Sequence, residues 1–177
     1  MMKEITSVHN AAAQLLRELQ KPRARREHGL FVCESAKMVG EAVALHLAQT
    51  LFVEKGREAE YAQMAAQAES MGCALYVVSQ AVMQAVSTAK TPQGIVCTAK
   101  IPEPPKTLTG KRIVALDGVQ DPGNVGTILR TADAAGLDGA IFGPGCADLY
   151  GAKTLRATMG SVFRVPVMMT DDLPGTL

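Results

Sequence analysis

The chain has 177 residues, of which 47% are hydrophobic and 20% charged, and its formal net charge is +1. This composition is typical of a globular protein with one sizeable core or two small domains. A net charge so close to zero does not by itself indicate nucleic-acid binding, so any basic surface must be local. The low aromatic content of 4% argues against binding of single strands by base stacking.

The four cysteines lie far apart, with no Cys-x-x-Cys pair and no histidine at ligand spacing. We therefore expect buried reduced thiols rather than a zinc site or a disulfide framework. No apolar run has the length of a membrane span, and the N-terminus lacks the apolar core of a signal peptide. These features predict a cytoplasmic protein.

The first hundred residues alternate between helical and strand patterns. Residues 6–20 have helical spacing with Ser7 as a plausible cap, and the basic stretch 21–29, "KPRARREHG", is predicted to be a loop broken by Pro22 and Gly29. Beyond it the patterns predict strands at 30–35, 50–54, 74–79 and 94–99 and helices at 35–48, 57–71 and 79–86. Such alternation indicates βαβ units and a largely parallel sheet.

A proline-rich stretch, "KIPEPPKTLTG" at residues 100–110, lacks periodicity and predicts a linker. We expect one domain over residues 1–100, a linker over 101–110 and a second α/β domain over 111–177. In the second domain the patterns predict strands at 112–118, 139–143 and 162–168, helices at 125–135 and 149–159, and a further helix opening in the last residues. A parallel sheet of three strands needs cover on both faces. We expect that cover from another copy of the chain or from residues beyond Leu177.

The stretch "LDGVQDPGNVGTILRTADAAG", residues 116–136, joins a predicted strand to a predicted helix. Asn124 is well placed as the N-cap of that helix, and Gly136 as its stop. Arg130 lies on the side opposite the predicted buried stripe of Val125, Ile128, Leu129 and Ala132. From the residues alone two readings stay open: a solvated arginine beside a capped helix, or an arginine and an asparagine converging on a phosphate or ribose.

Two nucleotide-binding patterns are absent. The stretch 145–155, "GCADLYGAKTL", has five residues between its glycines and an alanine before Lys153, so it does not fit the phosphate loop. No Gly-x-Gly-x-x-Gly follows the strand at 112–118, so the dinucleotide-binding fingerprint is missing too.

Residues 116–136 resemble the first signature motif of the SpoU (TrmH-type) RNA ribose 2'-O-methyltransferases, within the knotted SPOUT class. Residues 148–167, "DLYGAKTLRATMGSVFRVPV", are similar to the second motif. Residues 28–42, "HGLFVCESAKMVGEA", and residues 91–99, "TPQGIVCTA", resemble the L30e-like substrate-binding domain that often precedes the catalytic domain. The resemblance covers roughly residues 5–170 and implies an α/β fold, with an L30e-like domain followed by an incomplete Rossmann-like SPOUT domain.

The resemblance implies S-adenosylmethionine as methyl donor and a homodimer. The acceptor that it implies is a ribose 2'-hydroxyl of structured RNA, with ribosomal RNA as the first choice and transfer RNA as the alternative. Asn124 and Arg130 match the catalytic positions of the first motif, and Lys153 and Arg156 match basic positions of the second. A free guanidinium is a poor proton acceptor, so Arg130 is better suited to orient the ribose and stabilise an alkoxide than to act as a base. Nothing matches the third, Asn-Glu-Gly motif, so we expect an inactive fragment without the donor pocket, whose exposed sheet favours self-association.

Basic residues cluster around the end of the first predicted helix and the loop after it, where they can neutralise RNA phosphates. The predicted RNA contacts are Arg17, Lys21, Arg23, Arg25 and Arg26, with Lys37 from the substrate-domain resemblance. The three histidines are expected to be surface or packing residues. Two alternatives stay open: a non-catalytic RNA-binding adaptor, and an α/β enzyme that holds a small-molecule phosphate at residues 117–124.

Overall fold

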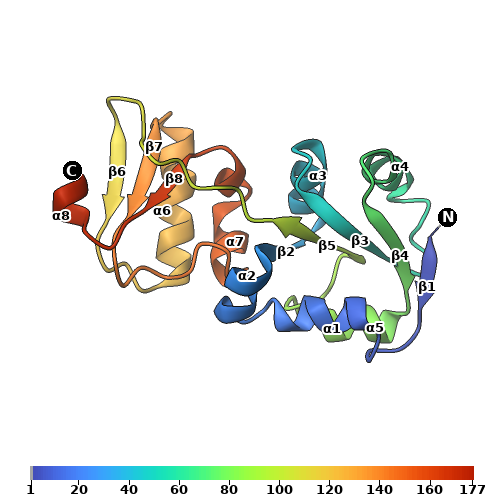
Figure 1. Ribbon diagram of the computed structural model, residues 1–177. Coiled ribbons are helices and arrows are strands. Elements are labelled where there is room, and N and C mark those ends of the chain that lie inside the picture. Colours follow the sequence, from blue (N-terminus) through green and yellow to red (C-terminus); the bar gives the residue numbers. More distant parts are fainter. Residues whose placement is uncertain (1) are drawn as a thin grey trace. The chain divides into compact units, whose positions relative to one another are not determined.

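The computed structural model describes residues 2–177 as two compact units, one up to Ile101 and one over Pro102–Leu177. Figure 1 shows the helices and strands of both. The elements of the first unit are β1 (Lys3–Ile5), α1 (Ala11–Glu18), α2 (Pro22–His28), β2 (Leu30–Glu34), α3 (Ala36–Ala44), β3 (Ala48–Glu54), α4 (Ala62–Ser70), β4 (Ala74–Val78), α5 (Gln80–Val86) and β5 (Ile95–Lys100).

The first sheet is mixed, which corrects the prediction of a largely parallel one. Its five strands have the order β1-β4-β3-β5-β2, and β5 runs antiparallel to both β3 and β2. A parallel connection needs a crossover that returns to the opposite end of the sheet. Helix α5 has only seven residues, and Thr88 just after it donates its backbone N–H to Glu34 at the carboxyl end of β2 (2.8 Å). The chain therefore re-enters the sheet from that end.

Helices cover both faces of this sheet. In Figure 1, α1 and α5 lie on one face and α3 and α4 on the other. The core beneath α1 and α5 is built by alternate strand residues, among them Val32, Phe52 and Val96, against Leu16 and Met83. Because successive strand residues point to opposite faces, their neighbours, such as Leu51 and Cys97, are buried on the other side.

The basic stretch 21–29 is a helix rather than the predicted loop. Pro22 occupies the first turn of α2, where its missing N–H is not needed, and Gly29 ends the helix with a left-handed φ of 64°. The preceding helix α1 begins at Ala11, later than predicted. Its cap is Asn10, whose side chain accepts the N–H of Ala12 (2.9 Å), instead of Ser7.

The second unit is the predicted three-stranded parallel sheet, with the order β6-β7-β8. Strand 112–118 is confirmed as β6, and the segment 162–168 divides into a short 3₁₀ turn and β8. A helix also opens after Asp172, as predicted. The elements of this unit are β6 (Ile113–Leu116), α6 (Pro122–Ala134), β7 (Gly139–Phe142), α7 (Ala152–Thr158), the 3₁₀ turn Ser161–Phe163, β8 (Val167–Met169) and α8 (Leu173–Thr176).

Helix α6 begins three residues earlier than predicted, and Asn124 is not its cap. Asp121 is the N-cap, and its Oδ1 accepts the backbone N–H of Asn124 (2.8 Å). Pro122 then occupies the first helical position, for which its fixed φ is suited. The buried side of α6 includes Val125, Leu129 and Ala132 as predicted, whereas Ile128 is only half-buried.

Helices α6 and α7 approach each other closely at a glycine. A Cβ atom on Gly126 would collide with the Cβ of Ala157 and would lie 2.7 Å from the carbonyl oxygen of Thr154. Thr154 in turn is buried, and its hydroxyl donates to the Asp148 carbonyl (2.8 Å). The position therefore accepts no side chain without displacing the backbone of α7.

We expect Gly126→Val to lower the free energy of unfolding by about 1–3 kcal/mol, because its side chain overpacks a helix contact made of backbone. Urea unfolding followed by circular dichroism measures the change. The control is Thr127→Ala, an exposed position of the same helix, whose effect is expected to stay within about 0.5 kcal/mol. Equal stability of the two variants would contradict the close contact.

Arg25 differs from its basic neighbours because it is only 4% exposed and its Nη1 donates to the Leu19 carbonyl (2.7 Å). Arg25→Met leaves that buried carbonyl without its partner, so we expect a loss of about 1–3 kcal/mol in unfolding free energy. Arg26→Met, at an exposed position, is expected to change stability by no more than about 0.5 kcal/mol. The same urea titration compares them, and an unchanged midpoint for Arg25→Met would disprove the structural role.

Candidate functional site

The connection between β6 and α6 forms a polar corner at the carboxyl end of a parallel strand. A second loop runs beside it, because Gly143 N–H donates to the Leu116 carbonyl and Ala147 N–H to the Val119 carbonyl, each at 2.9 Å. Ligands of open parallel sheets bind outside the carboxyl ends of the strands. This corner is thus the place in the second unit where the fold positions a site.

Asp121 joins the starts of α6 and α7. One carboxylate oxygen caps α6, and the other lies 3.5 Å from Nζ of Lys153 at the start of α7. The hydrogen bond from the Asn124 backbone, followed by the charge of Lys153, holds the pKa of Asp121 below its ordinary value. The sequence reasoning missed Asp121, although an aspartate directly before a proline is a recognisable helix start.

The capping carboxylate of Asp121 argues against the alternative of a small-molecule phosphate site at residues 117–124. A helix N-terminus attracts anions through its free N–H groups and its dipole. Here the carboxylate of Asp121 already occupies that position and accepts one of those N–H groups. The start of α6 therefore offers no support for a phosphate bound at this corner.

Asn124 and Arg130 both lie on the exposed side of α6, but they do not converge. They are six positions apart in the helix, which corresponds to about 9 Å along its axis and about 120° around it. Arg130 and Asn124 therefore point to different sides of α6. Within residues 2–177 Arg130 forms no ion pair, so its guanidinium is available to a ligand.

The second motif supplies two further exposed cations. Lys153 and Arg156 lie one turn apart on the outer face of α7. Because α6 and α7 pack together at Gly126, Arg130, Lys153 and Arg156 all belong to one helix pair. The structure thus places three of the four residues predicted in this unit as exposed cations on one helix pair, while Asn124 lies on another side of α6.

The predicted RNA contacts of the first unit fall into three groups. Four of them, Arg17, Lys21, Arg23 and Arg26, are exposed around the end of α1 and along α2. Arg25 is buried and bonded to the backbone, so it is corrected from a surface contact to a structural residue. Lys37 is exposed but lies beyond the carboxyl end of β2, whereas α2 precedes the start of that strand.

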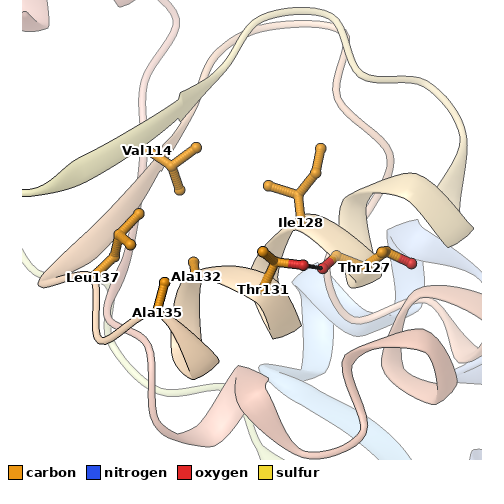
Figure 2. A pocket seen from close by; sticks show the side chains of 7 residues that line it. All are labelled: Val114, Thr127, Ile128, Thr131, Ala132, Ala135 and Leu137. Atoms are coloured by element: carbon orange, nitrogen blue, oxygen red, sulfur yellow. Dashed lines mark hydrogen bonds between the residues drawn. The ribbon is translucent and has the colours of Figure 1, made fainter.

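A hollow of about 230 Å³ lies beside α6 on the β6 side. Figure 2 shows Val114 and Leu137 on one side of it and Ile128 and Thr131 on the other. The Thr131 hydroxyl donates to the Thr127 carbonyl (2.9 Å), so it is satisfied within the helix. We call this surface the apolar shelf; its lining residues are Val114, Thr127, Ile128, Thr131, Ala132, Ala135 and Leu137.

Residues 2–177 contain neither a metal-binding cluster nor a helix suited to span a membrane. Histidine, cysteine, aspartate and glutamate side chains form no group of three or more that suits a metal ion in this part of the chain. None of its helices combines the length and apolar character that a membrane span requires. All four cysteines are free thiols, and three of them are buried.

Comparison with known proteins gives two family matches. Residues 111–177 match the SpoU rRNA Methylase family, and residues 10–97 match the MRM3-like substrate binding domain. The chain is 35% identical over 167 residues to the 23S rRNA (guanosine(2553)-2'-O)-methyltransferase RlmP of Bacillus subtilis, an alignment covering 94% of this chain and 65% of that protein.

Solved structures agree with the sequence matches. An rRNA methyltransferase from Sinorhizobium meliloti superposes with a TM-score of 0.85 at 34% identity, over 96% of this chain and 65% of that one. The AdoMet-bound structure from the same organism gives 0.84 at 35% identity, over 95% and 64%. The chain thus spans just under two thirds of the length of these relatives. It combines a SpoU methylase domain over residues 111–177 with an MRM3-like substrate-binding domain over residues 10–97.

Proposed function

We propose that this chain takes part in 2'-O-methylation of ribosomal RNA, with S-adenosylmethionine as the methyl donor. The observation that carries the proposal is the exposed guanidinium of Arg130 on α6, the helix that follows the carboxyl end of β6. Among residues 2–177 it pairs with no carboxylate. Support comes from the relatives, since RlmP is named as a ribose 2'-O-methyltransferase of 23S rRNA and a neighbouring structure holds AdoMet.

The chemistry assigns a role to Arg130. S-adenosylmethionine would supply an electrophilic methyl group to the ribose 2'-oxygen and leave as S-adenosylhomocysteine, and the proton of the hydroxyl would pass to water. The guanidinium keeps its own proton at any ordinary pH, so Arg130 does not accept the proton of the hydroxyl. It donates hydrogen bonds that orient the ribose and stabilise the negative charge developing on the 2'-oxygen. Asn124, on the other side of α6, is proposed as a second polar contact to the nucleotide.

The apolar shelf does not suit the methyl donor. S-adenosylmethionine carries a carboxylate, an ammonium group and a sulfonium, and charged groups need polar partners when they leave water. None of the seven residues lining the shelf has a charged side chain. We therefore assign donor binding to none of them, and we derive no step from their contacts.

The first unit is proposed to bind the RNA. Its match is to a substrate-binding domain, and its exposed Arg17, Lys21, Arg23 and Arg26 suit the phosphate backbone. Lys153 and Arg156 are proposed as phosphate contacts beside the ribose. Because the relatives named above act on rRNA, we propose ribosomal rather than transfer RNA. The free state of all four thiols accords with action in the reducing cytoplasm.

Arg130→Ala is expected to reduce methyl transfer about 10²–10³-fold, the usual cost of removing one donor that stabilises an oxyanion. Transfer of tritiated methyl groups to unmodified 23S rRNA is measured with a protein of the relatives' length that contains these residues. Arg130→Lys is expected to restore only part of the rate, because an ammonium lacks the planar fork of donors.

The matched control is Thr131→Ala, the next exposed position on α6, which should retain the wild-type rate. Full activity of Arg130→Ala would remove this arginine from the mechanism. RNA binding by the wild-type protein without any transfer would favour the adaptor alternative instead.

We also propose a homodimer in which a second copy covers the apolar shelf. Exposed apolar surface with a hollow favours association because burying it is stabilising. Sedimentation velocity is expected to show a concentration-dependent dimer for wild type and a shift to monomer for Ile128→Glu, which places a charge on the shelf. Ala134→Glu, on another side of α6, should leave the dimer intact. A wild-type monomer at every concentration would contradict the proposal.

A further inference from the structure

We infer that the RNA-facing surface of the first unit is a basic corner that includes Lys100, His28 and His46, none of which the sequence analysis assigned to RNA. The corner consists of these three residues with Arg17, Lys21, Arg23 and Arg26. Its ligand is the phosphate backbone of a folded RNA. The inference deepens the proposed function and rests on it.

Three strand ends bring the corner together. Lys100 is the last residue of β5 and pairs in register with Leu30, the first residue of β2. Beside this pair, Ile101 N–H donates to the Gly29 carbonyl (2.8 Å), and Lys100 N–H donates to the Leu47 carbonyl (2.9 Å). Neighbouring strands lie about 4.8 Å apart. One end of the sheet therefore carries Lys100 together with His28, which precedes Gly29, and His46, which precedes Leu47. All three side chains are exposed.

The charge of this end is strongly positive. Five exposed cations, Arg17, Lys21, Arg23, Arg26 and Lys100, face only two carboxylates in the same segments, Glu18 and Glu27. Arg23 pairs with Glu27 (2.7 Å), but both side chains stay largely exposed, at 85% and 55%, so the pair is weak. The imidazoles of His28 and His46 add N–H donors that can reach phosphate oxygens.

The opposite end of the sheet is electrically balanced. Lys55 there pairs with Glu4 (2.7 Å) and Arg57 with Glu60 (2.8 Å). The carboxylate of Glu34 is held by Thr88, whose N–H and hydroxyl both donate to it. The two ends of β2, at Leu30 and Glu34, lie roughly 13 Å apart. Lys37 belongs to the balanced end and is therefore outside the corner.

The side chains of the corner select the backbone of RNA rather than its bases. The corner residues include no aromatic side chain, Phe31 next to them is fully buried, and Tyr61 lies toward the opposite end, where its hydroxyl donates to the Gln93 carbonyl. Unstacked bases have no platform here. Cations spread over α1, α2 and β5 instead suit a line of phosphates, as in recognition of folded RNA by shape.

The test is binding of a fluorescein-labelled RNA hairpin with a mixed-sequence stem, followed by anisotropy across a salt series. Lys100→Gln is expected to weaken binding and to reduce the slope of log K against log salt by about 1, the loss of one phosphate contact. Lys90→Gln, an exposed lysine in the loop at the balanced end, is the matched control and should leave affinity and slope unchanged.

The outcomes separate this inference from the proposed function. Steep salt dependence in wild type, with Lys100→Gln indistinguishable from Lys90→Gln, overturns the corner and leaves the function standing. A larger loss for Lys90→Gln than for Lys100→Gln also overturns it. If the wild-type protein fails to bind the hairpin at low salt, both claims are refuted: that the first unit binds RNA and that the basic corner is its RNA-facing surface. Circular dichroism of each variant confirms that the fold is intact.

Discussion

The contact of α6 with α7 at Gly126 is the constraint on which the candidate active site depends. Because no side chain separates the helices there, their first turns come close enough for Asp121 to reach both the α6 backbone and Lys153. The same contact turns Val125 and Leu129 toward the sheet and leaves Arg130 on the outer face. The packed helix pair fixes the backbone position of Arg130 without a salt bridge to its guanidinium. The N–H groups of that guanidinium therefore stay available to a ligand.

The order of elements in the second unit was readable from the sequence because strands and helices alternate at regular spacing, with each strand short and apolar. The direction of strands in the first unit was not readable. Alternation of strand and helix does not reveal whether a helix spans the sheet, and α5 is too short to do so. The antiparallel entry of β5 follows from that length and from the contact of Thr88 with Glu34, which joins residues 54 positions apart.

The wrong predictions for α2 and α6 have two physical causes, a proline at the first helical position and the periodicity of the helix. Both Pro22 and Pro122 begin helices, whereas the sequence analysis placed Pro22 in a loop and began the second helix only after Asn124. Proline at a first helical position moves the cap to the residue before it, which is why Asp121 rather than Asn124 caps α6. Arg25 was grouped with its neighbours by sequence distance, whereas a helix of 3.6 residues per turn directs one of several adjacent arginines inward. Its bond to Leu19 depends on how α1 and α2 meet, which no local pattern specifies.

A net charge of +1 concealed how the charges are distributed. In the first unit, the cations at the carboxyl end of β2 lie among carboxylates, and two of them form ion pairs. The cations near its start exceed the carboxylates of the same segments. The field at one end of a sheet depends on charges within about a Debye length, roughly 8 Å at physiological salt, so charges across the sheet do not cancel it. A nearly neutral protein can therefore present a local basic surface without the non-specific attraction that a uniformly basic one would have. Under the proposed function, contacts confined to a few phosphates leave the choice of nucleotide to the shape of the RNA and to the residues around Arg130.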